Sequence, residues 1–170
     1  MQINNLCKIQ RKYSSGADTG IPVMTNDIWA VLARYDDCFE FRDFLLFKLC
    51  DIMYCEGCTE SAYLNHVASR LHLSAPKISF VLADNMADIV LLNGWIADKA
   101  LIGLYKCKDN EARIYIGSVL STTNKSLMLK EIDNESMVDG VFRHYYKSIS
   151  AISFCDEYAE MLQTMLDSGD

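Results

Sequence analysis

Between residues 93 and 116 the hydrophobic pattern of the chain changes its period. Before this stretch the apolar residues recur at helical spacing, and Asn93-Gly94 ends the last such segment as a left-handed C-terminal cap would. After it, residues 100–107 and 112–116 have the composition of two strands, and the polar residues 108–111 are typical of a turn between them. The pattern therefore predicts helices followed by a β-hairpin.

Helical spacing and capping residues predict further helices on both sides of this hairpin. Ser74 is expected to cap the helix before it, with Pro76 in the first turn, where a missing N–H costs nothing. We detect no internal repeat, and we expect a mainly α protein with a small β-hairpin (α+β). The expected helices occupy residues 25–39, 41–54, 59–71 and 74–92, and lie within 122–168.

Composition places the chain among folded proteins. Of its 170 residues, 51% are hydrophobic and 23% are charged, which suits one domain with one core. The mixed polar residues 1–24 predict a flexible extension. No apolar run reaches the length of a membrane span, and the first residues lack the order of a secretory signal. We therefore expect a cytoplasmic protein with no membrane partner.

Seven cysteines carry one candidate motif. Without a secretory signal, most are expected to be reduced and packed in the core. Cys55 and Cys58 form a C-x-x-C pair, followed by His66 and His72, which is a pattern open to a metal site or a redox switch. The spacing differs from that of a C2H2 finger, so a turn with inward-facing thiols is favoured and no metal is expected.

Catalytic motifs are missing from the sequence. There is no phosphate-cradling glycine loop, no H-E-x-x-H and no nucleophile elbow. The three histidines and the scattered carboxylates form no recognisable acid–base set. We therefore expect neither an enzyme nor a cofactor.

Helix, short turn, helix and hairpin is the order of a winged helix-turn-helix. At this point residues 25–168 resemble the MarR family of bacterial transcription regulators. Four motifs carry the resemblance in order: the turn motif over residues 66–79, Asn93-Gly94-Trp95-Ile96, the wing tip over residues 108–113, and Val119-Leu120-Ser121-Thr122-Thr123. In the family about ten residues separate the turn-motif serine from the closing glycine, whereas Ser79 and Gly94 are fifteen apart (94 − 79). The recognition helix would then be about a turn longer, or kinked, or bulged near Asp84-Asn85.

The resemblance implies a single domain over residues 25–170. Its winged helix-turn-helix core would occupy residues 41–121, and its dimerisation helices residues 25–39 and 122–168. A homodimer would bind double-stranded DNA at a pseudopalindromic site, with each recognition helix in the major groove and half-sites about 34 Å apart. The function expected from the resemblance is therefore transcription regulation.

Seven residues are candidates for DNA contact. Those near the recognition helix would bind bases or phosphates, and those on the wing would contact the flanking backbone. They are Arg70, Ser74, Lys77 and Ser79 near the helix, and Lys106, Lys108 and Arg113 on the wing. Each also has a structural interpretation, since Ser74 is a helix cap and the lysines suit a solvated surface. The net charge is −7, although residues 59–125 carry +1.

Other partners stay open. The resemblance implies a cleft for an aromatic or lipophilic effector, walled by Tyr35, Phe39 and Phe47, which as apolar residues also suit a core. The acid excess and the apolar helix over residues 74–92 favour an alternative function. This is a winged-helix protein–protein interaction module, or a DNA-mimicking antagonist of another regulator, that does not itself bind DNA. A thiol- or metal-responsive regulator using Cys55 and Cys58 is a third hypothesis.

Overall fold

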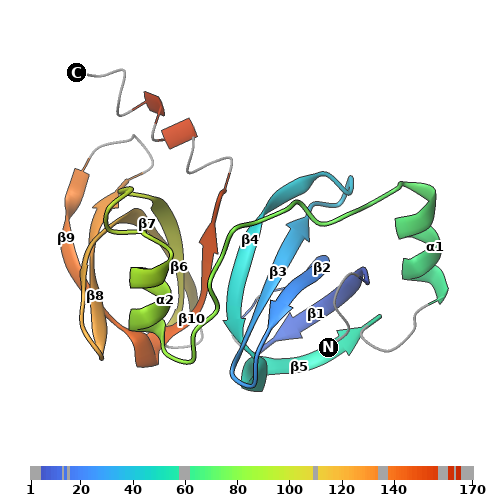
Figure 1. The fold of residues 1–170 in the computed structure, drawn as a ribbon, viewed down its shortest axis with the longest axis horizontal. Coiled ribbons are helices and arrows are strands. Elements are labelled where there is room, and N and C mark those ends of the chain that lie inside the picture. Colours follow the sequence, from blue (N-terminus) through green and yellow to red (C-terminus); the bar gives the residue numbers. More distant parts are fainter. Residues whose placement is uncertain are drawn as a thin grey trace.

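The computed structural model describes residues 5–12, 14, 16–57, 62–108, 111–133, 138–156, 161–162 and 164–165. These residues form one ten-stranded antiparallel sheet (Figure 1), with the strand order β5-β1-β2-β3-β4-β10-β6-β7-β8-β9. The strands are Cys7–Arg11 (β1), Ala17–Thr25 (β2), Trp29–Tyr35 (β3), Phe41–Lys48 (β4), Ile52–Glu56 (β5), Leu101–Lys108 (β6), Glu111–Thr122 (β7), Ser126–Ile132 (β8), Val138–Tyr145 (β9) and Ile149–Phe154 (β10). Two helices, Ala62–Arg70 (α1) and Met86–Leu92 (α2), lie between β5 and β6.

The sheet overturns the expected fold class and the resemblance to the MarR family. Strand β3 lies within the expected dimerisation helix over residues 25–39, and β8, β9 and β10 lie within residues 122–168, where further dimerisation helices were expected. The expected helix over residues 41–54 consists of β4, a 3₁₀ turn at Leu49–Asp51 (η1) and part of β5. Strands β1 and β2 begin within residues 1–24, where a flexible extension was expected. The protein is mainly β, and no winged helix-turn-helix is formed by the described residues.

Burial on both faces explains why the apolar residues of these strands also fit the spacing of a helix. Every residue of β3 is buried, and five consecutive residues of β4 are buried as well. A strand covered on both sides needs apolar residues at all positions rather than at alternate ones. Residues such as Val31, Leu32 and Tyr35 then satisfy helical spacing by coincidence, because a continuous apolar run fits either period.

The predicted hairpin and parts of two predicted helices are confirmed. Strands β6 and β7 pair from Leu101 opposite Ser118 to Lys108 opposite Glu111. Helix α1 lies within the expected residues 59–71. Helix α2 ends at Leu92, and Gly94 has a φ of 69°, as the expected left-handed cap requires.

The prediction of a recognition helix over residues 74–92 is wrong for residues 74–85. Residues 73–83 form neither helix nor strand, and α2 begins only at Met86. The Asn85 side chain, rather than Ser74, caps the helix by accepting a hydrogen bond from the backbone N–H of Asp88 at 2.9 Å. The extended segment is tied to the end of α2 by Asn93, whose side-chain amide bonds both the N–H and the carbonyl of Val81.

The sheet contains an internal structural repeat, which the sequence analysis missed. Each half is a four-strand meander whose fifth strand returns to pair with the first. The order β5-β1-β2-β3-β4 is followed by β10-β6-β7-β8-β9. Each fifth strand is preceded by a 3₁₀ turn, η1 in the first half and Tyr146–Ser148 (η2) in the second. The halves join where β4 pairs with β10.

The registers of the halves coincide when residues 97 positions apart are superposed. Gly20 faces Arg34 across β2 and β3, and Gly117 faces Glu131 across β7 and β8 (117 − 20 and 131 − 34). Bulges follow the same rule. They lie between Pro22 and Met24 and between Val119 and Ser121, and again between Arg34 and Tyr35 and between Glu131 and Ile132.

Hydrogen bonds of the connections repeat as well. The N–H of Leu49 donates to the Ile28 carbonyl at 2.9 Å, and the N–H of Tyr146 donates to the Lys125 carbonyl at 3.0 Å. The first strands follow an offset of 95, since Cys7 faces Gly20 and Ile102 faces Gly117. The repeat therefore extends over all five strands of each half.

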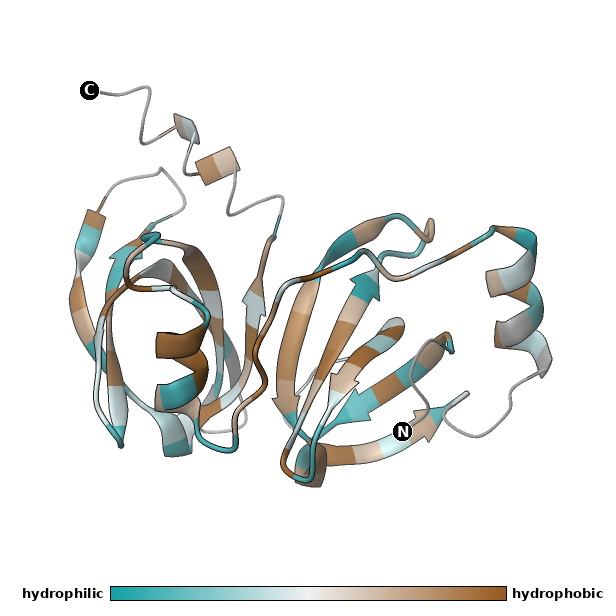
Figure 2. Cartoon of the chain, in the orientation of Figure 1, coloured by the Kyte–Doolittle hydropathy of each residue, from teal (hydrophilic) through white to brown (hydrophobic). Residues whose placement is uncertain are grey.

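Equivalent residues of the halves face opposite sides of the continuous sheet. Because each half has an odd number of antiparallel strands, superposing one on the other requires a turn of 180° about the direction of strand stacking. Leu32 accordingly packs with Phe47 and Ala151 on one side. Its counterpart Leu129 packs on the other side, in the cluster that includes α2. Figure 2 shows the apolar α2 lying within the curl of the second half.

The first half curls strongly. The guanidinium carbon of Arg11 on β1 lies 5.8 Å from the ring centre of Phe47 on β4, and 6.0 Å from that of Tyr105 on β6. In a flat sheet, three strand spacings alone separate β1 from β4 by about 14 Å. The curl therefore brings polar side chains of β1, β2 and β3 together beside the joint between the halves.

Gly20 and Gly117 permit close approach of neighbouring strands. A Cβ atom at Gly20 would lie 2.5 Å from the Ala33 carbonyl oxygen, and one at Gly117 would lie 2.2 Å from that of Lys130. We expect Gly20→Ala and Gly117→Ala each to lower the free energy of unfolding by about 1–3 kcal/mol in urea denaturation, because backbone must move. Gly16→Ala is the control, since nothing lies within 4 Å of that position. Equal stability of all three variants would contradict this account.

Candidate functional site

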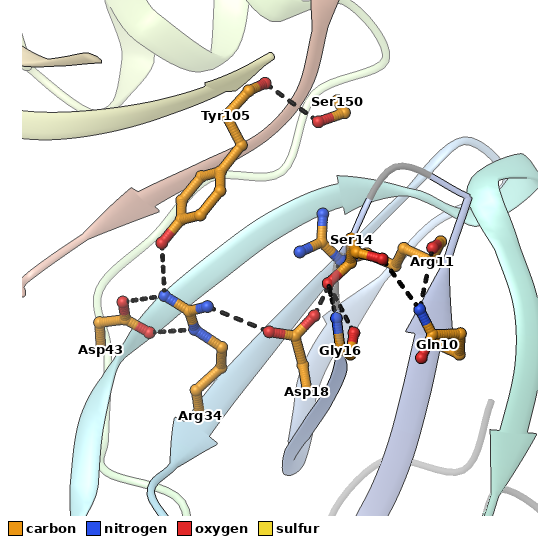
Figure 3. A network of polar contacts seen from close by, with 9 residues as sticks. All are labelled: Gln10, Arg11, Ser14, Gly16, Asp18, Arg34, Asp43, Tyr105 and Ser150. Atoms are coloured by element: carbon orange, nitrogen blue, oxygen red, sulfur yellow. Dashed lines mark hydrogen bonds and ion pairs between the residues drawn. The ribbon is translucent and has the colours of Figure 1, made fainter. Parts of the chain in front are cut away.

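A buried polar network occupies the first half (Figure 3). Arg34 on β3 lies opposite Asp43 on β4. Its Nε donates to Asp43 Oδ1 at 2.5 Å, and its Nη2 donates to Asp43 Oδ2. Asp18 accepts from Arg34 Nη1 at 3.1 Å and from Arg11 Nε at 2.9 Å. Two guanidinium groups are therefore held by two carboxylates from four neighbouring strands.

The network reaches across the joint into the second half. Arg34 Nη2 donates to the hydroxyl of Tyr105 on β6 at 3.0 Å, and the Ser150 hydroxyl on β10 donates to the Tyr105 carbonyl at 3.0 Å. The Arg34 guanidinium carbon also lies 5.5 Å from the centre of the Tyr105 ring. The network thus fixes the curl of the first half against β6.

Burial and ion pairing act against each other at this network. Burial disfavours the Arg34 cation, but the hydrogen bond and charge of Asp43 outweigh it, so the pKa of Arg34 is raised above its usual range. Burial likewise raises the pKa of Asp43, and the hydrogen bond from Arg34 opposes the rise. We treat the contact as an ion pair, because a guanidinium does not lose its proton and its paired donors need an acceptor.

The second half places a different cluster at the equivalent positions. Lys106, Tyr115, Glu131 and His144 correspond to Arg11, Asp18, Arg34 and Phe47. Nε2 of His144 lies 2.6 Å from Oε1 of Glu131. The Tyr115 ring stands edge-on to the imidazole, with ring centres 5.2 Å apart, and the Lys106 Nζ lies 5.1 Å from the Tyr115 ring centre.

The charged forms of this second cluster are disfavoured. Burial, reinforced by the charge of Lys106, lowers the pKa of His144 to about 4. Burial raises the pKa of Glu131, with Asp139 adding to the rise and Lys106 opposing it. Burial also lowers the pKa of Lys106. His144 is therefore neutral near pH 7, and its Nδ1 has no hydrogen-bond partner among the described residues.

The surface of the described residues has two shallow hollows. One of about 170 Å³ opens over Asp18 and Arg34. Another of about 280 Å³ lies where the two 3₁₀ turns meet, and its lining includes Lys48 and Lys147. No group of three or more His, Cys, Asp and Glu side chains is arranged to hold a metal ion in the described parts of the chain.

The outer strands of the sheet, β5 and β9, expose large apolar side chains. Each has a pairing partner on one side only within the described structure. Met53 and Tyr54 on β5 are 66% and 58% exposed. On β9 four such residues are about half exposed, and Figure 2 shows apolar residues recurring along this strand. They are Val138, Val141, Phe142 and Tyr145.

The candidates for DNA contact are not gathered by a recognition helix. Ser74, Lys77 and Ser79 are exposed on the extended segment 73–83, and Arg70 ends α1. The Ser74 carbonyl accepts a hydrogen bond from the Tyr35 hydroxyl at 2.9 Å. DNA binding itself stays a prediction, but the helix on which its geometry depended is absent from these residues.

The expected wing residues do lie on the hairpin. Lys106 and the exposed Arg113 face each other across β6 and β7. Lys108 ends β6, and its side chain is outside the described residues. Lys106 is half-buried beside Glu131 and Tyr115 instead of being fully exposed.

The expected effector-binding residues do not line one cleft. Tyr35 and Phe47 are buried in clusters on opposite faces of the sheet. Phe39 lies in the turn after β3 with a φ of 62° and packs against the Tyr35 side. The described structure explains all three as core residues, which was the alternative interpretation.

Cys55 departs from the expected reduced state, because it is disulfide-bonded in β5. Cys58 lies outside the described residues, whereas Cys7, Cys38, Cys50 and Cys155 are not disulfide-bonded. His66 lies on α1 and His72 in the turn that follows it. Among the described residues, neither helix is long or apolar enough to cross a membrane.

Comparison with protein families, curated proteins and solved structures finds no match to this chain.

The two polar clusters and the outer strands were not predicted from the sequence. Arg34 and Asp43 are charged residues inside apolar runs, and that signal alone marks them as buried partners. His144 and Glu131 carry no comparable signal, because the surrounding residues are mixed. An outer strand depends on the order of the whole sheet, which no local pattern encodes.

Proposed function

We propose that the protein is a non-catalytic protein-interaction module that adds an extended segment of a partner polypeptide to the outer edge of β9. An outer strand presents unpaired N–H and C=O groups, and extended peptides bind such edges by continuing the sheet. The supporting observation is the row of four half-exposed apolar side chains on β9. Natural sheets usually protect their edges with charge, proline or covering segments.

The side chains of β9 suit this role. Val141 is 50% exposed and Phe142 is 45% exposed, and neighbouring residues of a strand point to opposite faces. An added strand would therefore meet an apolar side chain of β9 on each of its faces. Main-chain hydrogen bonds would provide affinity, and Val141 and Phe142 would select apolar partners.

This proposal retains protein interaction from the alternative function without its winged helix. A binding module also agrees with the two polar clusters, whose groups mostly bond one another rather than surrounding a large cavity. We infer no reaction from them.

A peptide with the sequence of β10, Ile149–Phe154, is a suitable probe, because β10 already pairs with β4, the counterpart of β9. We expect saturable binding and slowed amide exchange along β9. The double variant Val141→Lys/Phe142→Lys should weaken binding at least about tenfold by removing apolar contacts. Leu120→Lys, at a residue 43% exposed on β7, is the matched control.

A second control concerns the peptide. Methylating alternate backbone nitrogens of the probe removes donors while keeping every side chain. Equal binding of the methylated probe, or exchange protection away from β9, would show that strand addition at β9 does not occur.

A further inference from the structure

The joint between the two halves is a template for a contact between molecules. In this joint β4 pairs with β10, through Phe44 opposite Phe154, Leu45 opposite Ser153, Leu46 opposite Ile152 and Phe47 opposite Ala151. By the internal repeat, β9 is the counterpart of β4, and β5 is the counterpart of β10. The two outer strands, β9 and β5, are therefore the counterparts of β4 and β10, which pair inside the chain.

From this equivalence we infer that a second copy of this chain occupies the β9 edge, with β9 of one copy pairing antiparallel to β5 of the next. The inference rests on the proposed function, since it names the partner of that edge. Moving the joint by 97 positions gives the register. His144 faces Tyr54, Arg143 faces Cys55, Phe142 faces Glu56 and Val141 faces Gly57 of the next copy.

The side chains at this register are compatible. No two like charges face each other, and like charges are what destabilise cross-strand pairs. Tyr54, which faces His144, becomes a diagonal neighbour of Phe142 on the same face. These two side chains are 58% and 45% exposed in the single chain, and diagonal neighbours are within reach of aromatic rings. The contact therefore covers exposed apolar surface on both strands.

The symmetry of the contact determines the kind of assembly. Pairing β9 with β5 uses two different surfaces, so the contact is head-to-tail and leaves a further β9 and a further β5 open. Such contacts build open chains, or rings where the rotation closes. A symmetric dimer would instead pair β9 with β9, which the internal joint does not resemble.

Sedimentation of the full chain over a range of concentrations tests the assembly. We expect species at multiples of 19.3 kDa whose share increases with concentration. Val141→Lys/Phe142→Lys should move the association midpoint to at least about tenfold higher concentration, and Leu120→Lys should leave it unchanged. A single chain at every concentration, or association unaffected by the β9 variant, would overturn the inference.

Photocrosslinking tests the register. A photoreactive phenylalanine analogue replaces Phe142, and isotopically light and heavy chains are mixed so that links between copies can be identified. We expect links to residues 54–57 of the other copy, and none to these residues when the analogue replaces Leu120. Links from position 142 to β9 of the other copy would show a symmetric dimer and overturn the head-to-tail register.

The two sets of experiments separate this inference from the proposed function. Binding of the β10 peptide at β9 by a chain that never associates would retain the interaction module and reject self-assembly. Association without links between β9 and β5 would reject the register. Failure of both peptide binding and association would reject the function as well.

Discussion

Replacing Arg34 with methionine should lower the free energy of unfolding by about 3–5 kcal/mol, as measured by urea denaturation near pH 7. Asp43 is fully buried and its carboxylate has both oxygens bonded to Arg34. Without the guanidinium this carboxylate is a buried charge that has lost the cation bonded to both of its oxygens, and Asp18 also loses its bond from Arg34. The loss of stability therefore comes mainly from the buried Asp43 carboxylate that has lost its bonds to Arg34.

Two further variants separate pairing from packing. Arg34→Met combined with Asp43→Leu removes both charges, and we expect it to recover most of the lost stability, because apolar replacement of a whole buried pair is often neutral. Arg11→Met should cost less than Arg34→Met, since Asp18 keeps its bond to Arg34. A double variant as unstable as the single one would show that the network is needed for shape rather than for charge balance.

Local elements were predictable where the sequence carries an unambiguous local signal. The sequence between β6 and β7 is polar and short, and the end of α2 is marked by Asn93-Gly94. Both signals act within a few residues, so tertiary packing does not alter them. The wrong predictions concern the segments on either side of these signals, where apolar residues at helical spacing belong to strands.

The extended segment 73–83 shows the limit of capping rules. Ser74 and Pro76 form a good helix start, and Ile78 and Leu82 fit a helical face. In the structure these residues instead lie over the sheet in an extended form, with the apolar side chains of Ile78, Phe80 and Leu82 against the main core. Apolar burial across the sheet outweighed the local preference.

The internal repeat was invisible in the sequence because the halves share strand pairing and bulge positions rather than residue identity. Leu32 and Leu129 are identical, yet Arg34 corresponds to Glu131 and Phe47 to His144. The close-approach glycines Gly20 and Gly117 were the one signal with a physical cause. They identify a repeat only once the strand pairing is known.

The candidate edge on β9 was unpredictable for a related reason. Val141, Phe142 and Tyr145 fall within residues 122–168, where helices were expected. Whether such residues are buried depends on what lies beside the strand, and β9 is the last strand in the order. Half-exposed apolar residues indicate a binding edge only when the strand order shows that they lie on an outer strand.

Replacing His144 with phenylalanine should remove a pH dependence of stability of about 3 kcal/mol between pH 6.5 and pH 4. The pKa of His144 is lowered to about 4 in the folded protein, from 6.5 when unfolded. Between these values the unfolded chain binds more protons, so the free energy of unfolding falls as the pH falls. This contribution is complete above pH 6.5 and is lost by about pH 4.

The difference between wild type and His144→Phe at each pH isolates this effect from other groups. Glu131 acts in the opposite direction, because its raised pKa makes its ionisation destabilising as the pH increases. Measuring the same difference in a Glu131→Gln background removes that contribution. Phenylalanine is the suitable replacement, since the equivalent position in the first half is the fully buried Phe47. A difference that stays constant from pH 4 to pH 6.5 would mean that His144 is not a buried neutral imidazole.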